Sequence, residues 1–388
     1  MGQSPQEDMH LHKAAVIFEG GTPPQNDLQE TLTGLRHAIT LDTIEKYVHA
    51  GLDQVVLATN FPNLARAANR LGAQVYDTRT DRPFHFGRTL QQIVAGLGAS
   101  GVLYCSGAAL PLISPAEIAW ILNAMEQHAP CVVVNNLQSV DLVAWNPPEY
   151  IQRIAPPEND NFLGWLLREA GMERILIPSS AGIHFDLDTP TDYLILALSG
   201  LGGPRARAAL RAVTWSSERL AKAADTLAAD LPEVAAIGRV GTPIIDHFNR
   251  YLRVRLRVFS EERGMKALRR DEEGRVMSLV ADMIDDLGPK RFFRRLESIC
   301  AAAFFDTRVV FANRGRKVSE WDRYHSDLGE VDKIKDPWVR SFTEAALECS
   351  IPVVLGGHSV VAGGLWVLAD RAIAMRGGPR HSQAKGFA

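Results

Sequence analysis

Two aspartates lie two residues apart in the stretch His184–Tyr193, which reads HFDLDTPTDY. On an extended chain Asp186 and Asp188 point to the same face, because side chains alternate along a strand. The same stretch also has the pattern of a helix start. In D-T-P-x-D, Asp188 can cap a helix, with Asp192 favouring its positive end. The spacing therefore leaves two interpretations for the aspartates, a carboxylate pair that holds a ligand and a helix cap.

Glycines and arginines elsewhere could bind phosphate. Gly20 and Gly21 follow the apolar run AAVIF, where they either let the backbone approach a base or phosphate or only form a turn. Between residues 306 and 327 the chain carries many charges of both signs. Arg314, Arg316 and Arg323 in this stretch suit phosphate groups by their bidentate geometry, and a solvated charged loop is the alternative.

A second glycine-rich segment, VLGGHSVVAGGLW, spans residues 354–366 and contains two glycine pairs. Glycine-rich loops can present amide N–H groups to anions. The same glycines could instead allow apolar segments to pack closely where only glycine fits. Both interpretations are kept for this segment.

Apolar runs and helical patterns alternate along the first two hundred residues. The apolar runs are AAVIF, QVVLAT, AQVYD, GVLYC and CVVVNN. Helical segments separate them, among them FPNLARAANRLG, closed by Gly72, and SPAEIAWILNAMEQ, which Ser114 caps. Alternation of this kind predicts an α/β domain over residues 1–200, with a mostly parallel sheet and helices on both faces.

The pattern changes after the GLGGPRA segment near residue 200. Helical spacing prevails in RARAALRAV, SSERLAKAADTLAADL, IIDHFNRYLRVRLRVFSEERG, RVMSLVADMIDDLG and KRFFRRLESICAAAFFD. We therefore expect a mainly helical second domain over residues 204–375. We expect the tail, residues 376–388, to be disordered.

The charge is distributed unevenly along the chain. The first 203 residues hold 11 Lys and Arg against 21 Asp and Glu, and the rest hold 31 against 24. Two units with different surfaces, able to share an anionic ligand, would produce this split. We expect no nucleic-acid partner, because the basic residues of the second half are interleaved with acids.

Composition is that of a soluble globular protein, with 46% hydrophobic and 22% charged residues. The apolar runs fall short of the ~20 residues that a membrane helix needs, and the start lacks a signal-peptide pattern. We therefore expect a cytoplasmic protein without a membrane partner. The four cysteines are widely spaced and are expected to be buried free thiols. The oligomeric state is left open.

The first 200 residues resemble the nucleotidyltransferase-type α/β fold (nucleotide-diphospho-sugar transferase-like) of the molybdenum-cofactor and 2-phospho-L-lactate guanylyltransferases. The resemblance rests on AVIFEGG, on HFGRTLQQIVAGLGASGVLYCSGAALPLIS, and on the late segment that closes with D-x-D-T-P-x-D. It implies Mg²⁺ as cofactor, a nucleoside triphosphate (NTP) as substrate and a small phosphorylated or carboxylated acceptor. Asp186 or Asp188 would hold the metal, and Asp186 would be catalytic.

The sequence departs from the family pattern at two places. Ala109 stands where the family has its other metal-binding acid, and the loop after Gly21 lacks the family's Arg and Lys. Arg36 is the nearest substitute and is taken as a second catalytic candidate, whereas Glu19 has the wrong sign for a triphosphate.

Three hypotheses follow. The chain is a Mg²⁺-dependent nucleotidyltransferase, or a non-catalytic nucleotide or sugar-phosphate binding protein that has lost the metal acid, or a protein whose second half has an activity of its own. Whether it is an enzyme is left open, with a preference for the nucleotidyltransferase because the late D-x-D-T-P-x-D element remains.

Overall fold

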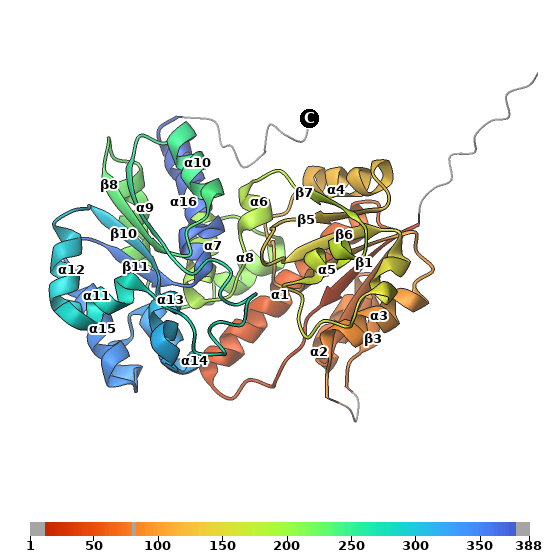
Figure 1. Cartoon of the computed structure of the whole chain (residues 1–388), viewed down its shortest axis with the longest axis horizontal. Coiled ribbons are helices and arrows are strands. Elements are labelled where there is room, and N and C mark those ends of the chain that lie inside the picture. The colour runs from red at the N-terminus through yellow and green to blue at the C-terminus, as the bar shows by residue number, and fades with distance from the viewer. Residues whose placement is uncertain (1–11, 80–82, 378–388) are drawn as a thin grey trace, which may run out of the picture. The chain divides into compact units, whose positions relative to one another are not determined.

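The computed structural model describes residues 12–79 and 83–377 (Figure 1). Most of the expected tail, from residue 378 on, lies outside the described residues. The chain divides into two compact units, each built from several segments. Unit 1 comprises Met1–Pro23, Thr43–Gly107 and Pro115–Ile177, and unit 2 comprises Pro24–Asp42, Ala108–Ser114 and Pro178–Ala388. The division thus differs from two consecutive domains that meet near residue 200.

Unit 1 contains a seven-stranded sheet in the order β3-β2-β1-β4-β6-β5-β7. Its strands are β1 (Lys13–Phe18), β2 (Gln54–Thr59), β3 (Gln74–Asp77), β4 (Gly101–Ser106), β5 (Cys131–Val134), β6 (Leu142–Asn146) and β7 (Glu173–Leu176). Every pairing is parallel except those of β6, which runs antiparallel to β4 and β5. The expected mostly parallel α/β fold is confirmed.

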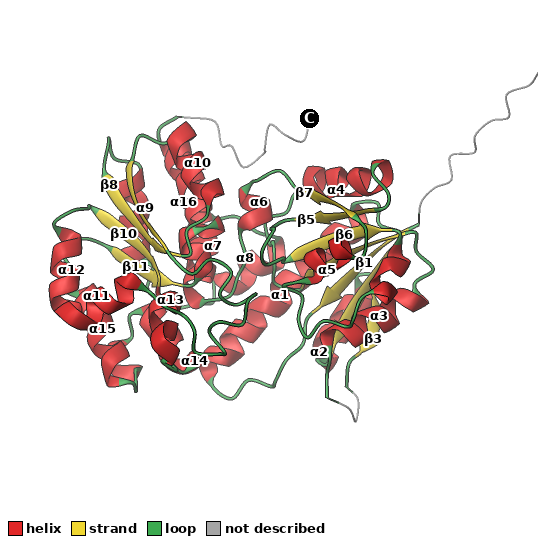
Figure 2. Cartoon of the chain, in the orientation of Figure 1, coloured by secondary structure: helices red, strands yellow, loops and turns green. Residues whose placement is uncertain are grey.

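Helices connect these strands (Figure 2). They are α2 (Pro62–Arg70), α3 (Phe86–Gly96), α4 (Pro115–Gln127), η1 (Pro148–Arg153) and α5 (Leu163–Glu169). Helix α1 (Asp27–His49) contributes residues to both units. Helix α2 ends before Gly72, which has a positive φ of 91°, and α4 begins at Pro115, directly after the expected cap. Local signals in the sequence therefore placed these helix ends correctly.

Unit 2 has a parallel sheet of its own, in the order β11-β10-β8-β9. The strands are β8 (Glu233–Gly238), β9 (Arg255–Ser260), β10 (Ala302–Asp306) and β11 (Val353–Gly356). Helices supply most of the regular structure around them, as expected. The centre of the unit is nevertheless a sheet, which the expectation of a mainly helical domain missed.

The single helix expected over residues 244–264 is wrong. Helix α10 (Thr242–Tyr251) covers only the first part of this segment, and strand β9 follows it. In RLRVFS the half-buried Leu256 and Val258 alternate with exposed Arg255 and Arg257, which is the period of a strand. The apolar AAFFD was likewise expected to end a helix, but it forms the fully buried strand β10.

Helices cover both faces of the second sheet (Figure 1). One face packs on α1, α7 (Pro190–Ser199), α9 (Glu218–Leu227), α10 and α16 (Gly363–Met375), and the other on α11 (Leu279–Leu287), α12 (Pro289–Glu297) and α15 (Pro337–Leu347). The remaining elements are α6 (Ala181–His184), α8 (Pro204–Leu210), α13 (Thr307–Ala312), η2 (Asn313–Gly315), α14 (Glu320–Leu328), η3 (Val331–Lys333) and η4 (His358–Val361). Neighbouring residues of β10 alternate between the two faces, which makes unit 2 a three-layer α/β structure.

The four cysteines are free thiols, as expected, and three of them are buried while Cys349 is half-buried. Within the described ranges, no helix is both long enough and apolar enough to cross a bilayer.

Candidate functional site

The capping role expected for Asp188 is wrong. Thr189 is the N-cap of α7, and Asp192 closes a capping box with it. One carboxylate oxygen of Asp192 accepts hydrogen bonds from the Thr189 amide at 2.7 Å, the Thr189 hydroxyl at 2.9 Å and the Asp188 amide at 3.0 Å. The cap therefore forms one residue later than expected, because the Thr–Asp pair satisfies the first amides of the helix.

The side chain of Asp188 is left facing cations. It is 52% exposed, and its Oδ2 lies 3.8 Å from Nζ of Lys266. The charge of Lys266, followed by those of Arg36 and Arg239, lowers the pKa of Asp188 although burial acts in the opposite direction. Two residues predicted from the sequence, Asp188 and Arg36, therefore lie close enough to interact electrostatically. Lys266 and Arg239, which were not predicted, belong to the same group of charges.

Asp186 and Asp192 have different surroundings. The backbone carbonyl of Asp186 accepts a 2.5 Å hydrogen bond from the Ser359 hydroxyl, and its carboxylate accepts one from the amide of Leu187 at 2.8 Å. Asp192 is fully buried, and burial together with the charge of Asp188 raises its pKa to about 8. Asp192 is therefore a structural acid, and the half-exposed Asp188 is the carboxylate open to a ligand.

A loop bounded by two glycines follows β8 and anchors the site. Arg239 in this loop forms a bidentate ion pair with Asp306 at the end of β10, with Nε–Oδ2 2.6 Å and Nη2–Oδ1 3.1 Å. Burial acts to raise the pKa of Asp306, but the charge and hydrogen bonds of Arg239 outweigh it and hold that pKa below its usual range. Gly238 has a φ of 119°, and a Cβ atom on it would lie 2.5 Å from that of Asp306. This close approach requires glycine.

The ion pair sits where the connections of the sheet change direction. The chain passes from β8 to β9 on one side, and then crosses to β10 and β11 on the other. In open parallel sheets, ligands bind outside the carboxyl ends of the strands at such a switch point. The Arg239–Asp306 pair therefore marks the place in unit 2 where the topology predicts a ligand.

Further donors surround this place. Helix α10 begins after its N-cap Gly241, and among the described residues no side-chain cap bonds to its first turn, which leaves amide donors at the positive end of the helix. A guanidinium nitrogen of the exposed Arg263 would lie 3.8 Å from a Cβ atom built on Gly241. Burial, and then the charge of Arg239, lowers the pKa of His358 to about 4, so its imidazole is neutral at pH 7.

A second buried ion pair adjoins the first. Arg308 donates to both carboxylate oxygens of Asp327, at 2.9 and 2.5 Å, and to the hydroxyl of Thr307 at 2.9 Å. That hydroxyl in turn donates to the carbonyl of Gly356 at 3.1 Å. These bonds tie the carboxyl ends of β10 and β11 together, which gives the site a rigid base.

The three arginines expected to bind phosphate have other neighbours. Arg314 pairs with Asp282, with Nε–Oδ1 3.0 Å, and Arg316 pairs with Asp285 at 3.0 Å. The guanidinium of Arg316 also lies over an indole ring, 3.8 Å from its centroid. Arg323 is half-buried, and burial lowers its pKa. Arg314 and Arg316 are therefore neutralised by carboxylates of α11 and are not among the charges that act on Asp188.

Gly20 and Gly21 lie in unit 1, after β1. The amide of Gly21 donates to Oδ1 of Asn60 at 3.0 Å, and its carbonyl accepts from Nδ2 of Asn60 at 2.7 Å. Glu19 beside them is buried, and so is Ala109 in unit 2. The glycine pair thus lies in a loop held by a side chain, which favours the structural interpretation of these residues.

The glycines near residue 360 also have a structural role. A Cβ atom would lie 2.3 Å from a side-chain atom of Val360 if built on Gly356, and 2.1 Å from the carbonyl of His184 if built on Gly363. Close packing therefore accounts for this segment.

Two parts of the site, the loop after β8 and Lys266, were not predicted from the sequence. The signal for the loop is the string EVAAIGRVGTP, in which an apolar run ends in two glycines and a helix start. It was overlooked because the surrounding segment was interpreted as helical. For Lys266 no local signal exists, since its role depends on tertiary packing.

A comparison with models of known protein families finds no match, and neither does one with curated proteins. Solved structures of similar fold exist. A nucleotidyl transferase from Methanothermobacter thermautotroptrophicus is 16% identical over 53% of this chain and 100% of its own, with a TM-score of 0.40. A cytidylyltransferase from Leptospira borgpetersenii is 11% identical over 52% and 94%, with a TM-score of 0.39.

A third similar structure is a Mycobacterium tuberculosis glucosyl-3-phosphoglycerate synthase in complex with Mn²⁺, uridine diphosphate and glucosyl-3-phosphoglycerate. It is 12% identical over 52% of this chain and 78% of its own, with a TM-score of 0.34. At this level of similarity, the chemistry of the present site has to follow from its own residues.

Proposed function

We propose that this chain binds the phosphate groups of a nucleotide or another phosphorylated small molecule at the carboxyl ends of β8 and β10 in unit 2. The observation that carries the proposal is the glycine-bounded loop Gly238–Gly241, with its buried Arg239–Asp306 pair, at the switch point of a parallel sheet. The uncapped start of α10 adds amide donors, which suit an anion.

The surrounding charges favour an anionic ligand. Arg239 is committed to Asp306, but Lys266 is 3.8 Å from Asp188, beyond hydrogen-bonding distance. Among the residues described, no ion pair or hydrogen bond engages the side chain of Arg263. Lys266 and Arg263 can therefore turn to a phosphate group without breaking a buried contact.

We further propose that the ligand is an NTP and that the reaction transfers its nucleotidyl group to a small phosphorylated or carboxylated acceptor. Magnesium fits this site only together with the triphosphate, because Lys266, Arg36 and Arg239 would repel a bare cation near Asp188. Mg²⁺ is commonly held by one or two carboxylates plus substrate phosphates, and Asp188 offers one half-exposed carboxylate. Bound there, the ion would neutralise phosphate charge, while Lys266 and Arg263 orient the phosphates.

A second candidate function is binding without catalysis, of a nucleotide or a sugar phosphate. Ala109 has no carboxylate to offer, and Asn60 holds the loop at Gly21. Both observations weaken the family-type metal and phosphate contacts that the resemblance implied for Gly20, Gly21 and Asp186.

Calorimetric titration of the full chain with ATP, GTP, CTP and UTP, in Mg²⁺ and in EDTA, tests both functions. We expect Lys266→Met to weaken binding on the order of tenfold, the usual scale for a charged contact. The matched control is Lys317→Met, which removes an exposed lysine from a loop of the same unit. Equal affinity of Lys266→Met and wild type, or no binding of any NTP, would contradict the proposal.

Asp188→Asn separates the two candidate functions. If Asp188 helps hold Mg²⁺, the variant loses the gain in affinity that Mg²⁺ gives to the wild type. If Asp188 is only a counter-charge, the variant binds NTP more tightly in EDTA, because a repulsive carboxylate has been removed. The second result would favour binding without metal-assisted transfer.

A further inference from the structure

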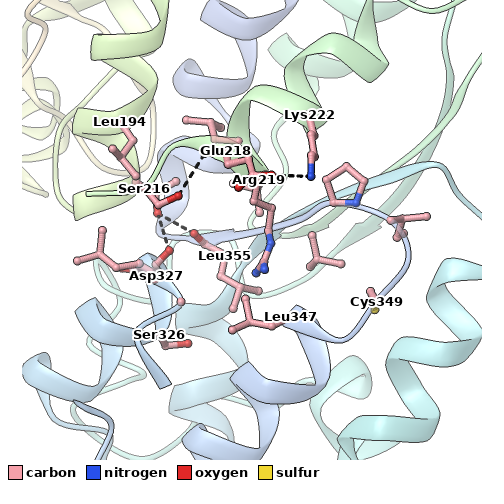
Figure 3. A pocket seen from close by; sticks show the side chains of 18 of the residues that line it. Leu194, Ser216, Glu218, Arg219, Lys222, Ser326, Asp327, Leu347, Cys349 and Leu355 are labelled. Atoms are coloured by element: carbon pink, nitrogen blue, oxygen red, sulfur yellow. Dashed lines mark hydrogen bonds and ion pairs between the residues drawn. The ribbon is translucent and has the colours of Figure 1, made fainter. Parts of the chain in front are cut away.

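A cavity of about 380 Å³ lies within unit 2, away from the loop after β8 (Figure 3). Its walls are the start of α9, the end of α14 and strand β11, which is hydrogen-bonded to β10 on one side only. The volume is in the range of small-molecule sites. Neither the sequence analysis nor the proposed function assigns it a role.

Arg219 extends from α9 into this cavity, with its guanidinium near Leu347 and Leu355 (Figure 3). The side chain is half-buried, and burial lowers its pKa. Within the part of the chain that the structure describes, no carboxylate pairs with Arg219 and no acceptor bonds to it. Its guanidinium nitrogens are not among the buried polar atoms, so these donors remain accessible and can bind a ligand in the cavity.

The other charges in the wall are already paired. Lys222 donates to Glu218 at 2.8 Å, and Asp327 is held by Arg308. Arg219 therefore supplies one positive charge in excess. A single excess charge suits a monoanion better than a dianionic phosphate.

The rest of the wall mixes apolar side chains with polar groups. Leu194, Leu347, Ile351 and Val353 line the cavity, and Thr191 closes part of the edge of β11 by donating to the carbonyl of Leu355 at 2.7 Å. A ligand here would place a charged group on Arg219 and an apolar group against these side chains. A charged group that binds one end of a ligand, with apolar side chains beside the other end, is typical of a small-molecule site.

We propose that this cavity binds a small monocarboxylate with a short apolar tail. The carboxylate pairs with the guanidinium of Arg219 in bidentate geometry, and the tail packs against the half-buried Leu347 and Ile351. The inference does not depend on the proposed nucleotide site, since no residue of the loop after β8 lines the cavity.

The test uses hexanoate as the probe, with methyl hexanoate and n-hexyl phosphate for comparison, and binding to the full chain is followed by calorimetry. Hexanoate should bind saturably, and both comparison compounds should bind more weakly. Arg219→Met should weaken hexanoate binding on the order of tenfold or more, the scale of a charged hydrogen-bonded pair. Arg211→Met, which removes an exposed arginine before α9, should leave it unchanged.

Leu347→Phe provides a second variant that does not touch the charge. It enlarges a half-buried lining residue, so it should reduce hexanoate affinity while a thermal unfolding scan shows a folded protein. The proposal is overturned if methyl hexanoate binds as well as the acid, if Arg219→Met retains the wild-type affinity, or if hexanoate does not bind. Tighter binding of hexyl phosphate would replace the carboxylate by a phosphate ester as the ligand class.

Discussion

Each of the two sheets has a glycine-containing loop directly after its first strand, and the two loops differ in what binds their backbone amides. After β1, Gly21 is held by both groups of the Asn60 amide, beside the buried Glu19. After β8, Gly238 brings Arg239 against Asp306, and two further cations lie nearby. At the same topological position, the loop in unit 1 has its backbone groups bonded to a side chain, whereas the loop in unit 2 is charged and keeps backbone amides without a side-chain partner among the described residues.

The difference shows that glycines in a loop indicate a phosphate site only where the backbone amides have no other hydrogen-bond partner. Backbone amides at Gly21 already have an internal partner, so a phosphate would have to displace Asn60. At the start of α10, no side chain of the described residues caps the amides. We therefore expect substitutions after β8 to have larger effects than matched substitutions in unit 1.

The largest effect is expected for Asp306→Ala. It leaves the buried guanidinium of Arg239 without a counter-charge, which typically costs about 3–5 kcal/mol in the free energy of unfolding. Urea denaturation measures this loss in the free energy of unfolding. Asp77→Ala, which breaks the exposed pair with Arg79 in unit 1, should cost much less. In the double variant Asp306→Ala, Arg239→Met, part of the loss should return, and a fully additive double variant would show that the pair is not coupled.

Because of two aspartates, the stability of the two units should depend on pH in opposite directions. The pKa of Asp192 is raised from 3.8 to about 8, so the folded state keeps a proton that the unfolded state releases, and stability falls as pH rises from about 4 to 8. The pKa of Asp77 is lowered to about 2 by Arg79, so its contribution is lost only as pH falls from about 4 to 2. Stability measured against pH for Asp192→Asn should lack the decline between pH 4 and 8. If the variant still lost stability between pH 4 and 8, titratable groups other than Asp192 would be the cause.

Gly238→Ala and Gly21→Ala compare the two loops directly. At Gly238 the positive φ and the 2.5 Å approach to Asp306 predict a loss of about 2 kcal/mol or more in the free energy of unfolding. At Gly21 no atom lies within 4 Å of the added Cβ and φ is not positive, so the change should stay within about 0.5 kcal/mol. Equal losses at the two positions would remove the distinction between the loops.

A small effect is expected for Asn60→Ala, which releases the amide and carbonyl of Gly21. Both groups are near solvent and can bond to water, so the loss should be about 1 kcal/mol. Because the proposed ligand site is in unit 2, NTP affinity measured by calorimetry should not change. A loss of NTP binding in this variant would instead place the nucleotide at the loop after β1.

Much of the fold could be predicted because the signals for it are local. The apolar runs before Gly20 and around Cys131 became strands, and Pro115 and Gly72 mark helix ends as expected. Strand β9 was not predicted, because it follows helix α10 almost directly. The spacing of apolar residues there fits both the helical repeat of 3.6 residues and the strand repeat of two.

The site was predicted only in part, because it depends on long-range packing. Asp188 and Arg36 were selected, and the structure places their charges together across some 150 residues of chain. Arg314 and Arg316 were selected for their residue type alone, and carboxylates of α11 neutralise them. Nothing in the sequence near either arginine indicates which aspartate it will meet.

Unit 2 is assembled from three separate stretches of chain, and this has a consequence for biosynthesis. The apolar side chains Leu28, Leu32, Leu35 and Ile39 of α1 belong to the same core as Phe304 and Val354. A ribosome therefore delivers the first part of this core more than two hundred residues before the last, and that part waits without its native partners. Long waits of this kind slow folding and expose apolar surface. Nascent chains stalled before β10 should accordingly be sensitive to protease and should recruit chaperones, and this vulnerability should end only once α16, which belongs to the same core, has emerged.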